Sequence, residues 1–174
     1  TEPGRDDPTQ PITRLEPDDD TWTLHGQKSM VVCADRASAV LLTARLDGEL
    51  VLLALDPTLP GISLIPQQVT TGEPQFSIRF DAAHVSQDDI IATGASAQCA
   101  IQSMVHHTLV ANSVMTLGVT DTMLKMTAAY TSQREQFGRP IATFQAVSHR
   151  AADAYIDVGN LRLACQQATS LLSA

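Results

Sequence analysis

The chain has 174 residues, of which 44% are hydrophobic and 17% charged, and its mean hydropathy is +0.00. These values argue against both an intrinsically disordered polar chain and a membrane-spanning one. Nineteen acidic residues outnumber eleven basic ones, so the net charge is −8 at pH 7, which disfavours phosphate backbones and anionic membrane surfaces as partners. We therefore expect a globular protein, of one domain or two small ones, that binds neither nucleic acid nor membrane.

Three cysteines lie far apart in the sequence, at Cys33, Cys99 and Cys165. Their odd number and wide spacing match neither a disulfide framework nor a CxxC metal pair, so we expect small buried hydrophobes in a reducing, cytoplasmic compartment. His106 and His107 are adjacent, and on a helix their side chains would point about 100° apart and could not hold one metal ion together. No metal site is predicted.

The first half of the chain, to about residue 94, is rich in Pro, Gly and Asp between short β-branched runs. The opening segment TEPGRDDPTQP holds three prolines, which predicts an extended loop. Strands are then expected, in chain order, at residues 22–25, 28–32, 40–44, 50–55, 62–65 and 76–80. Hairpin turns are expected near His25-Gly26 and Asp47-Gly48. Short strands separated by turns at this spacing predict a small antiparallel β-barrel or sandwich.

The second half carries long helical periodicity and a single proline, Pro140. A first helix is expected to begin between residues 95 and 100 and to run to about residue 136, where Gly138 and Pro140 would end it. A second helix is expected at about residues 144–172. Two helices joined by a short turn form an antiparallel hairpin, whose apolar face needs further helices from the same chain or a partner to cover it.

Together these elements predict an α+β protein. A small antiparallel β-barrel or sandwich domain at residues 1–94 is followed by a long antiparallel helical hairpin at residues 95–174, as an incomplete part of a helix bundle.

The segment between the two expected helices concentrates side chains that can bind a ligand. Arg134, Gln136, Phe137 and Gln145 lie around a tight turn, where a planar guanidinium and amides can meet a diphosphate or a flat ring. An alternative stays open on these residues alone, because Arg134 could complement the carboxyl end of the helix dipole while Phe137 packs on the turn.

Three motifs in this order resemble the acyl-CoA dehydrogenase family. Residues 134–153 carry RxQFGxPIxxFQAVxHxxAD, which is similar to the signature in that family's carboxy-terminal helical domain. Residues 1–4 read TEPG, which resembles the opening of the family's middle β-domain, and residues 22–28 carry WxLxGxK, which resembles a hairpin of that domain. The resemblance covers essentially the whole chain.

The resemblance implies a flavoprotein that uses FAD to introduce an α,β double bond into an acyl-CoA thioester. In the family a glutamate removes the α-proton, the flavin takes the β-hydride, and an electron-transfer flavoprotein receives the electrons. By the same resemblance, Thr1 would touch the flavin ring, and Arg134 and Gln136 would contact the FAD diphosphate. Phe137, Phe144 and Gln145 would lie beside the cofactor of a neighbouring subunit. A homo- or hetero-oligomer, a dimer or tetramer, is therefore implied.

The chain departs from the family pattern at several expected contacts. Met30 and Val32 stand where many members place an aromatic residue and a hydroxyl against the flavin, so a hydroxyl donor is lost. After TEPG, residues 5–8 replace a glycine and a Ser-Asp pair, which puts Asp7 at the substrate side. On the long helix, Leu109 occupies the position of an arginine for the CoA end, next to the polar run that begins at His106.

No catalytic residue is assigned in the sequence. The family's glutamate lies beyond residue 174 in most members, and in a minority an ungapped count places it at Thr108. The chain, which begins at Thr1 rather than Met, is therefore expected to be a partial one.

Two alternatives to a dehydrogenase stay open. One is a degenerate, non-catalytic subunit that helps complete a partner's FAD site. The other is a flavin monooxygenase or acyl-CoA oxidase on the same fold. Acyl chain preference is left open.

Overall fold

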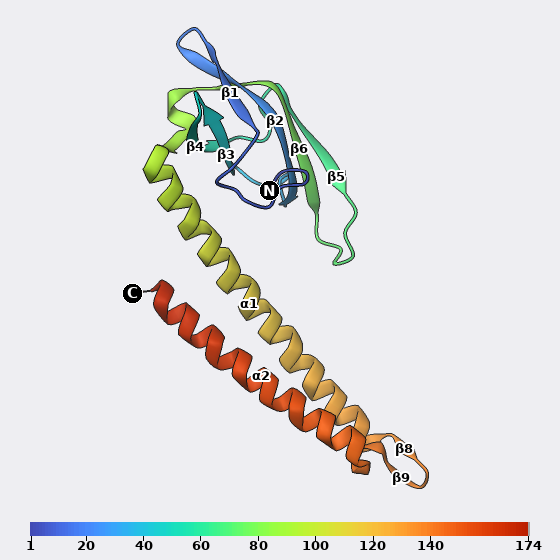
Figure 1. Cartoon of the computed structure of the whole chain (residues 1–174). Helices are drawn as coiled ribbons and strands as arrows, with labels where there is room; N and C mark the ends of the chain where they lie inside the picture. Colours follow the sequence, from blue (N-terminus) through green and yellow to red (C-terminus); the bar gives the residue numbers. More distant parts are fainter. Residues whose placement is uncertain (174) are drawn as a thin grey trace. The chain divides into compact units, whose positions relative to one another are not determined.

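The computed structural model describes residues 1–173 (Figure 1). The chain divides into two compact units, Thr1–Ser103 and Met104–Ala174, and each is described by itself. The sequence-based domain boundary at residues 94 and 95 stays a prediction about the whole protein. The first unit holds a seven-stranded sheet. Its strands are β1 (Arg14–Asp18), β2 (Thr21–Val32), β3 (Val40–Leu46), β4 (Glu49–Leu55), β5 (Ile62–Gln67), β6 (Gln75–Val85) and β7 (Ile90–Thr93), with the 3-10 helix η1 (Gln87–Asp89) before β7.

The sheet is open and mixed. Its strand order is β5-β6-β2-β1-β3-β4-β7, so β5 and β7 form two separate edges. Neighbouring strands pair antiparallel except β1 and β3, which meet in parallel at the single pair Arg14 and Arg45. The α+β class and the order of sheet and helices are confirmed. The sheet does not close into a barrel, because closure requires the edge strands to pair with one another.

The strand pair around Asp47-Gly48 is confirmed, whereas the turn expected at His25-Gly26 is wrong. β3 and β4 pair from Val40 to Leu46 without a register shift, and both turn residues have the positive φ that a tight hairpin needs. β2 instead runs unbroken through Gly26, with a bulge between Leu24 and Gly26. A Cβ at Gly26 would lie 2.8 Å from Thr13 Oγ1, so the glycine serves a close approach of two backbones rather than a turn.

One hydrophobic core stabilises the first unit. Its residues come mainly from β1, β2, β3, β4 and β6. They include the fully buried Leu24, Val51, Leu53, Leu55 and Ile78. β4 contributes an uninterrupted buried run from Leu50 to Leu53, which indicates that both faces of this strand are covered. Burying such side chains stabilises the unit by about 1.5–3 kcal/mol each. The sheet can therefore hold the opening loop in a fixed place.

The second unit is a helical hairpin with little core of its own. α1 (Gly94–Gln133) enters it from the first unit, and β8 (Glu135–Gln136), β9 (Arg139–Pro140) and the 3-10 helix η2 (Ile141–Thr143) lead to α2 (Gln145–Leu172). The two predicted helices are thus confirmed to within a few residues, and Figure 1 shows them running antiparallel. Between residues 104 and 173 only Cys165 is buried. Large apolar side chains are exposed along both helices, among them Leu109, Met115, Met123, Met126, Tyr155 and Leu163.

Two further findings bear on the sequence expectations. All three cysteines are free, and Cys165 is buried as expected, but Cys99 is exposed and Cys33 is half-buried. In the part of the chain that the structure describes, no helix is both long and apolar enough to cross a membrane.

Candidate functional site

The connection between α1 and α2 is a tight β-hairpin. β8 and β9 pair Gln136 with Arg139 around a two-residue loop, and both loop residues, Phe137 and Gly138, have positive φ of 55° and 76°. Two successive positive φ values define the turn that matches the natural twist of a hairpin. The carbonyl of Arg134 accepts a hydrogen bond of 2.8 Å from the Ile141 N–H, which ties the base of the hairpin to the end of α1.

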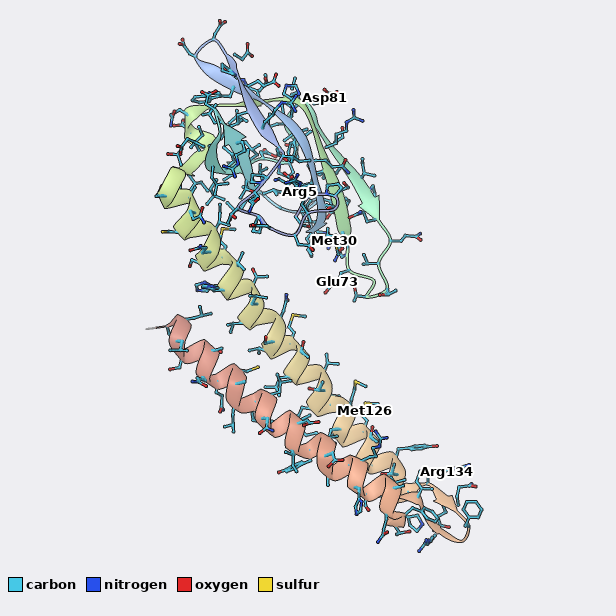
Figure 2. The ribbon with its side chains drawn as sticks, viewed as in Figure 1. Arg5, Met30, Glu73, Asp81, Met126 and Arg134 are labelled. Atoms are coloured by element: carbon cyan, nitrogen blue, oxygen red, sulfur yellow. The ribbon has the colours of Figure 1, made fainter. Side chains whose placement is uncertain are left out.

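Aromatic rings and cations gather on this hairpin. Phe137 is 93% exposed, and its ring meets Phe144 edge-on, with centroids 6.2 Å apart and planes at 85°. The Arg139 guanidinium lies 4.2 Å from the centre of the Phe144 ring, in cation–π geometry. Figure 2 shows Arg134 where α1 meets the hairpin. Its exposed side chain forms no ion pair within residues 1–173.

The hairpin and the residues that flank it include most of those that the sequence nominated for a cofactor. Gln136 and Phe137 belong to the hairpin, Phe144 caps α2, and Gln145 is the exposed first residue of α2. The sequence reasoning missed Arg139, although a second arginine within the same motif was a usable signal. Guanidinium groups bind phosphate through paired N–H donors, and an exposed ring can pack against a planar group. The donor set therefore fits an anionic ligand that also carries a flat ring, as FAD does.

In the first unit, Glu2 anchors the opening loop from a buried position. The side chain is 5% exposed and accepts hydrogen bonds from Lys28 Nζ (2.6 Å), Thr13 Oγ1 (2.6 Å) and the backbone N–H groups of Ile12 (2.7 Å) and Thr13 (3.0 Å). Burial opposes ionisation, but these hydrogen bonds, that of Lys28 foremost, outweigh it and lower the pKa of Glu2 to about 2. Burial also lowers the pKa of Lys28, and Glu2 partly offsets that effect.

Glu2 is consequently a structural carboxylate rather than a proton acceptor. The other glutamates of the described chain, Glu16, Glu49, Glu73 and Glu135, are exposed. A general base needs a position beside the reacting carbon and a pKa that suits proton transfer. Glu2 is held by its hydrogen-bond donors and the other four glutamates lie at the surface, so the geometry assigns this role to none of the five.

Thr1 lies against the part of β2 that contains Met30. The Ser29 N–H donates to the Thr1 carbonyl (3.0 Å), and Thr1 Oγ1 donates to the Ser29 carbonyl (3.3 Å). Met30 and Val32 follow with side chains that are 64% and 53% exposed. The structure thus joins Thr1 to the strand that carries Met30 and Val32, and the side chains of these two residues lie at the surface.

The residues expected near the substrate lie in different units. Asp7 belongs to the opening loop, where it accepts hydrogen bonds from Thr9 Oγ1 (2.6 Å), the Thr9 N–H (2.8 Å) and Gln10 (3.1 Å). The hydrogen bonds from Thr9 lower the pKa of Asp7. His106 and Leu109 lie exposed on α1 in the second unit. Among the described residues, no group of three or more His, Cys, Asp or Glu side chains is placed to hold a metal ion.

The second unit also contains an apolar groove between its helices, with a volume of about 590 Å³. Its lining includes Met123, Leu124, Ala151 and Val158. Arg150 is one of the charged residues of that lining. The ion pair between Asp121 and Arg162 (2.8 Å) joins the two helices. The sequence predicts an uncovered apolar face on this hairpin, and the exposed Leu109, Met115 and Leu163 agree with that prediction.

Comparisons with known proteins identify relatives for both units. Residues 99–174 match the model of the acyl-CoA dehydrogenase C-terminal domain. The acyl-CoA dehydrogenase FadE27 of Mycobacterium tuberculosis is 60% identical over 52 residues, which cover 30% of this chain and 14% of that protein.

Two solved structures are similar over nearly the whole chain. The ChsE4–ChsE5 complex from Mycobacterium tuberculosis is similar with 27% identity and a TM-score of 0.82, over 94% of this chain and 44% of that one. The steroid ACAD Tcur3481–Tcur3483 is similar with 33% identity and a TM-score of 0.75, over 93% of this chain and 43% of that one. The chain spans less than half of the length of each of these relatives. Both units carry the relationship, and the chain belongs to the acyl-CoA dehydrogenase family.

Proposed function

We propose that the chain forms part of a FAD-dependent acyl-CoA dehydrogenase, which introduces an α,β double bond into an acyl-CoA thioester. The observation that carries this proposal is the β8–β9 hairpin, where exposed Arg134, the Arg139–Phe144 stack and exposed Phe137 lie together. FAD, when bound, supplies the hydride acceptor. The chain's own residues bind and orient it.

Each side chain has a role that suits its chemistry. Arg134 and Gln136 bind the FAD diphosphate, since a guanidinium and an amide both donate N–H groups. Phe137, Phe144 and Gln145 pack and hydrogen-bond beside the cofactor. In the first unit, Thr1, Met30 and Val32 face the flavin ring. Because the side chains of Met30 and Val32 offer no hydroxyl, their contribution is exclusion of water rather than hydrogen bonding.

The wider setting follows from the same proposal. Asp7, His106 and Leu109 line the substrate side, and an electron-transfer flavoprotein accepts the electrons. The hairpin residues reach the FAD of a neighbouring subunit, so the working form is a homo- or hetero-oligomer, located in the cytoplasm. An acyl group derived from a steroid is the substrate class to test first, because one relative with 33% identity is a steroid ACAD.

A second candidate is a non-catalytic subunit of a heteromeric dehydrogenase. Val32 and Leu109 replace polar residues at expected flavin and CoA contacts, while the hairpin keeps its cations and rings. A similar structure is the complex of two differently named chains, ChsE4 and ChsE5. In this version the chain completes its partner's FAD site and leaves proton abstraction to that partner.

The test compares the full-length protein with Arg134→Ala, each purified alone and with a homologous partner subunit. Loss of a charge-assisted hydrogen bond should weaken FAD binding by about ten- to a hundredfold, measured by flavin fluorescence titration. The helical circular dichroism should stay unchanged, since Arg134 is exposed. Arg36→Ala, which removes an exposed arginine of the first unit, is the control and should leave FAD affinity unchanged.

The two candidate functions separate in the same experiment. Flavin and acyl-CoA-dependent dye reduction in the protein alone support the dehydrogenase and rule out the non-catalytic subunit. Flavin that binds only in the mixture supports the second candidate. Full FAD retention by Arg134→Ala would refute the role of the hairpin.

A further inference from the structure

β2 carries a second bulge directly beside the proposed flavin face. Lys28 pairs with Ile78 and Val31 pairs with Phe76, so Ser29 and Met30 together lie opposite the single residue Ser77. Met30 has a φ of 57°, a backbone angle that residues other than Gly, Asn and Asp seldom adopt. A bulge of this kind redirects the side chains that follow it. Such a conformation persists only where surrounding contacts hold it.

The backbone groups of this bulge are bound by contacts from outside the ladder. On one side, Ser29 exchanges hydrogen bonds with Thr1 through its N–H (3.0 Å) and its carbonyl (3.3 Å). On the other side, the Met30 N–H donates to the side-chain oxygen of Gln67 at 3.1 Å. Ser77 Oγ donates to the Lys28 carbonyl at 3.1 Å. Of these contacts, the hydrogen bond with Gln67 is the one made by Met30, the residue with the positive φ.

Gln67 is well placed for this role and has no part in the core. It is the exposed last residue of the edge strand β5, and it reaches a backbone group 37 positions away in the sequence. An exposed side chain at the end of an edge strand is not required for the sheet to form. Its hydrogen bond to Met30 therefore has a specific structural effect, which is to favour the conformation of the bulge.

We propose that Gln67 is a positioning residue of the FAD site, which holds the Ser29–Met30 bulge so that Met30 and Val32 present their side chains to the flavin ring. This inference rests on the proposed function, which places Met30 and Val32 there. Gln67 itself acts through the backbone of Met30 and needs no contact with the cofactor.

The test uses Gln67→Met in the full-length, flavin-loaded protein, with Gln68→Met as a matched control. Methionine keeps the length of the side chain but cannot accept the Met30 N–H strongly. Amide hydrogen exchange at Met30 should become roughly three- to tenfold faster, as for the loss of one hydrogen bond. FAD should dissociate about threefold more readily, and the visible circular dichroism and reduction potential of the flavin should shift. Gln68→Met should change none of these, because Gln68 is the adjacent exposed glutamine, one residue beyond β5.

A conservative variant adds a rescue arm. Gln67→Glu retains an acceptor oxygen, so slow exchange at Met30 should return even though the added charge alters the flavin potential by itself. Unchanged amide exchange at Met30 in Gln67→Met would refute the role of Gln67 in holding the bulge. Faster exchange with an unaltered flavin spectrum and affinity would reduce Gln67 to a local structural role and so overturn the positioning. Absence of flavin from the wild-type protein, alone and with its partner, would instead refute the proposed function before any variant is compared.

Discussion

Glu2 bears a negative charge in a position where an unpaired charge would be strongly unfavourable. Lys28 neutralises it at 2.6 Å, and three further donors from Ile12 and Thr13 saturate its oxygens. Removing one partner of a buried pair leaves the other charge without compensation. The pair links the opening loop to β2 immediately before the bulge, so stability and the shape of the proposed flavin face depend on the same contact.

Glu2→Gln should lower the free energy of unfolding by about 3–5 kcal/mol, because the amide leaves Lys28 charged and buried. Glu16→Gln is the matched control. Its ion pair with Arg14 (2.8 Å) is exposed, so the loss should stay below about 1 kcal/mol. Urea unfolding monitored by Trp22 fluorescence and by circular dichroism measures both. Equal effects of the two substitutions would contradict the structural role of Glu2.

The same comparison has a pH dependence with a defined sign. The pKa of Glu2 is about 2 in the folded chain, against an ordinary value of 4.5. Because the folded value is the lower one, its stabilisation is fully present above pH 4.5 and is lost as the pH falls towards 2. Glu2→Gln should remove that part of the acid destabilisation, whereas Glu16→Gln should keep it.

Residue roles of this kind were only partly predictable from the sequence. Arg134, Gln136 and Phe137 stand within one continuous motif, so their proximity follows from chain connectivity. Glu2 and Lys28 lie 26 positions apart, and their pairing depends on how the opening loop folds onto β2. Arg139 was overlooked because its role emerges from the ring of Phe144 rather than from its own position.

At the scale of elements, the β8–β9 hairpin is a short one, with two residues in each strand. Its loop depends on Gly138, whose φ of 76° lies in the left-handed region and whose missing Cβ would meet nothing within 4 Å. Any effect of adding a methyl group there is therefore conformational rather than steric. Gly118 in α1 also has open space around it, but its φ is not positive.

Replacing each of these two glycines by alanine should change stability in opposite directions. Gly138→Ala should destabilise the hairpin by about 1 kcal/mol, and amide exchange at Ile141 should become faster. Gly118→Ala should stabilise α1 by roughly 0.5–1 kcal/mol, because alanine is the better helix former. Thermal unfolding followed at 222 nm and amide exchange report the two signs. Stabilisation by both substitutions would show that the positive φ of Gly138 imposes no strain.

Elements with strong local signals were predicted well. The long helices follow from a sustained period and the glycine and proline that end the first one, and the β3–β4 hairpin follows from alternation around Asp47-Gly48. β1 and β7 were missed because they are short and depend on distant partners, β2 and β3 in one case and β4 in the other. Gly26 misled the prediction, since a glycine that marks a turn and one that permits close backbone contact look alike in sequence.

At the scale of the whole molecule, the two units differ in what stabilises them. The core residues of the sheet belong to the first unit, whereas residues 104–173 contain one buried side chain, Cys165. An apolar groove of about 590 Å³ runs between α1 and α2. Hydrophobic burial is the main stabilising contribution to folding, so the helical hairpin depends on additional packing surfaces.

Two fragments should therefore behave differently. Residues 1–103 should unfold in one cooperative thermal transition, because they contain the core. Residues 104–174 should melt gradually or self-associate and should bind the dye ANS through their apolar faces. Circular dichroism, ANS fluorescence and light scattering check both expectations. A sharp, dye-free, monomeric transition in the second fragment would contradict this division of stability.

The open sheet was the feature of the whole molecule that sequence reasoning missed. Regular short strands suit a closed barrel and an open sheet equally well, and only long-range pairing decides between them. Here β5 pairs with β6 alone and β7 with β4 alone, so neither edge finds the other.

That openness raises the question of why other chains do not extend the sheet. Pro66 lies within β5, and the pairing of β5 with β6 continues through it without a shift, so its ring nitrogen points to the free side. A strand that paired with this edge would lack a backbone N–H donor at Pro66, the penultimate residue of β5. The opposite edge, β7, is only four residues long. Both edges are thus poor templates for strand addition, which protects an open sheet from aggregation.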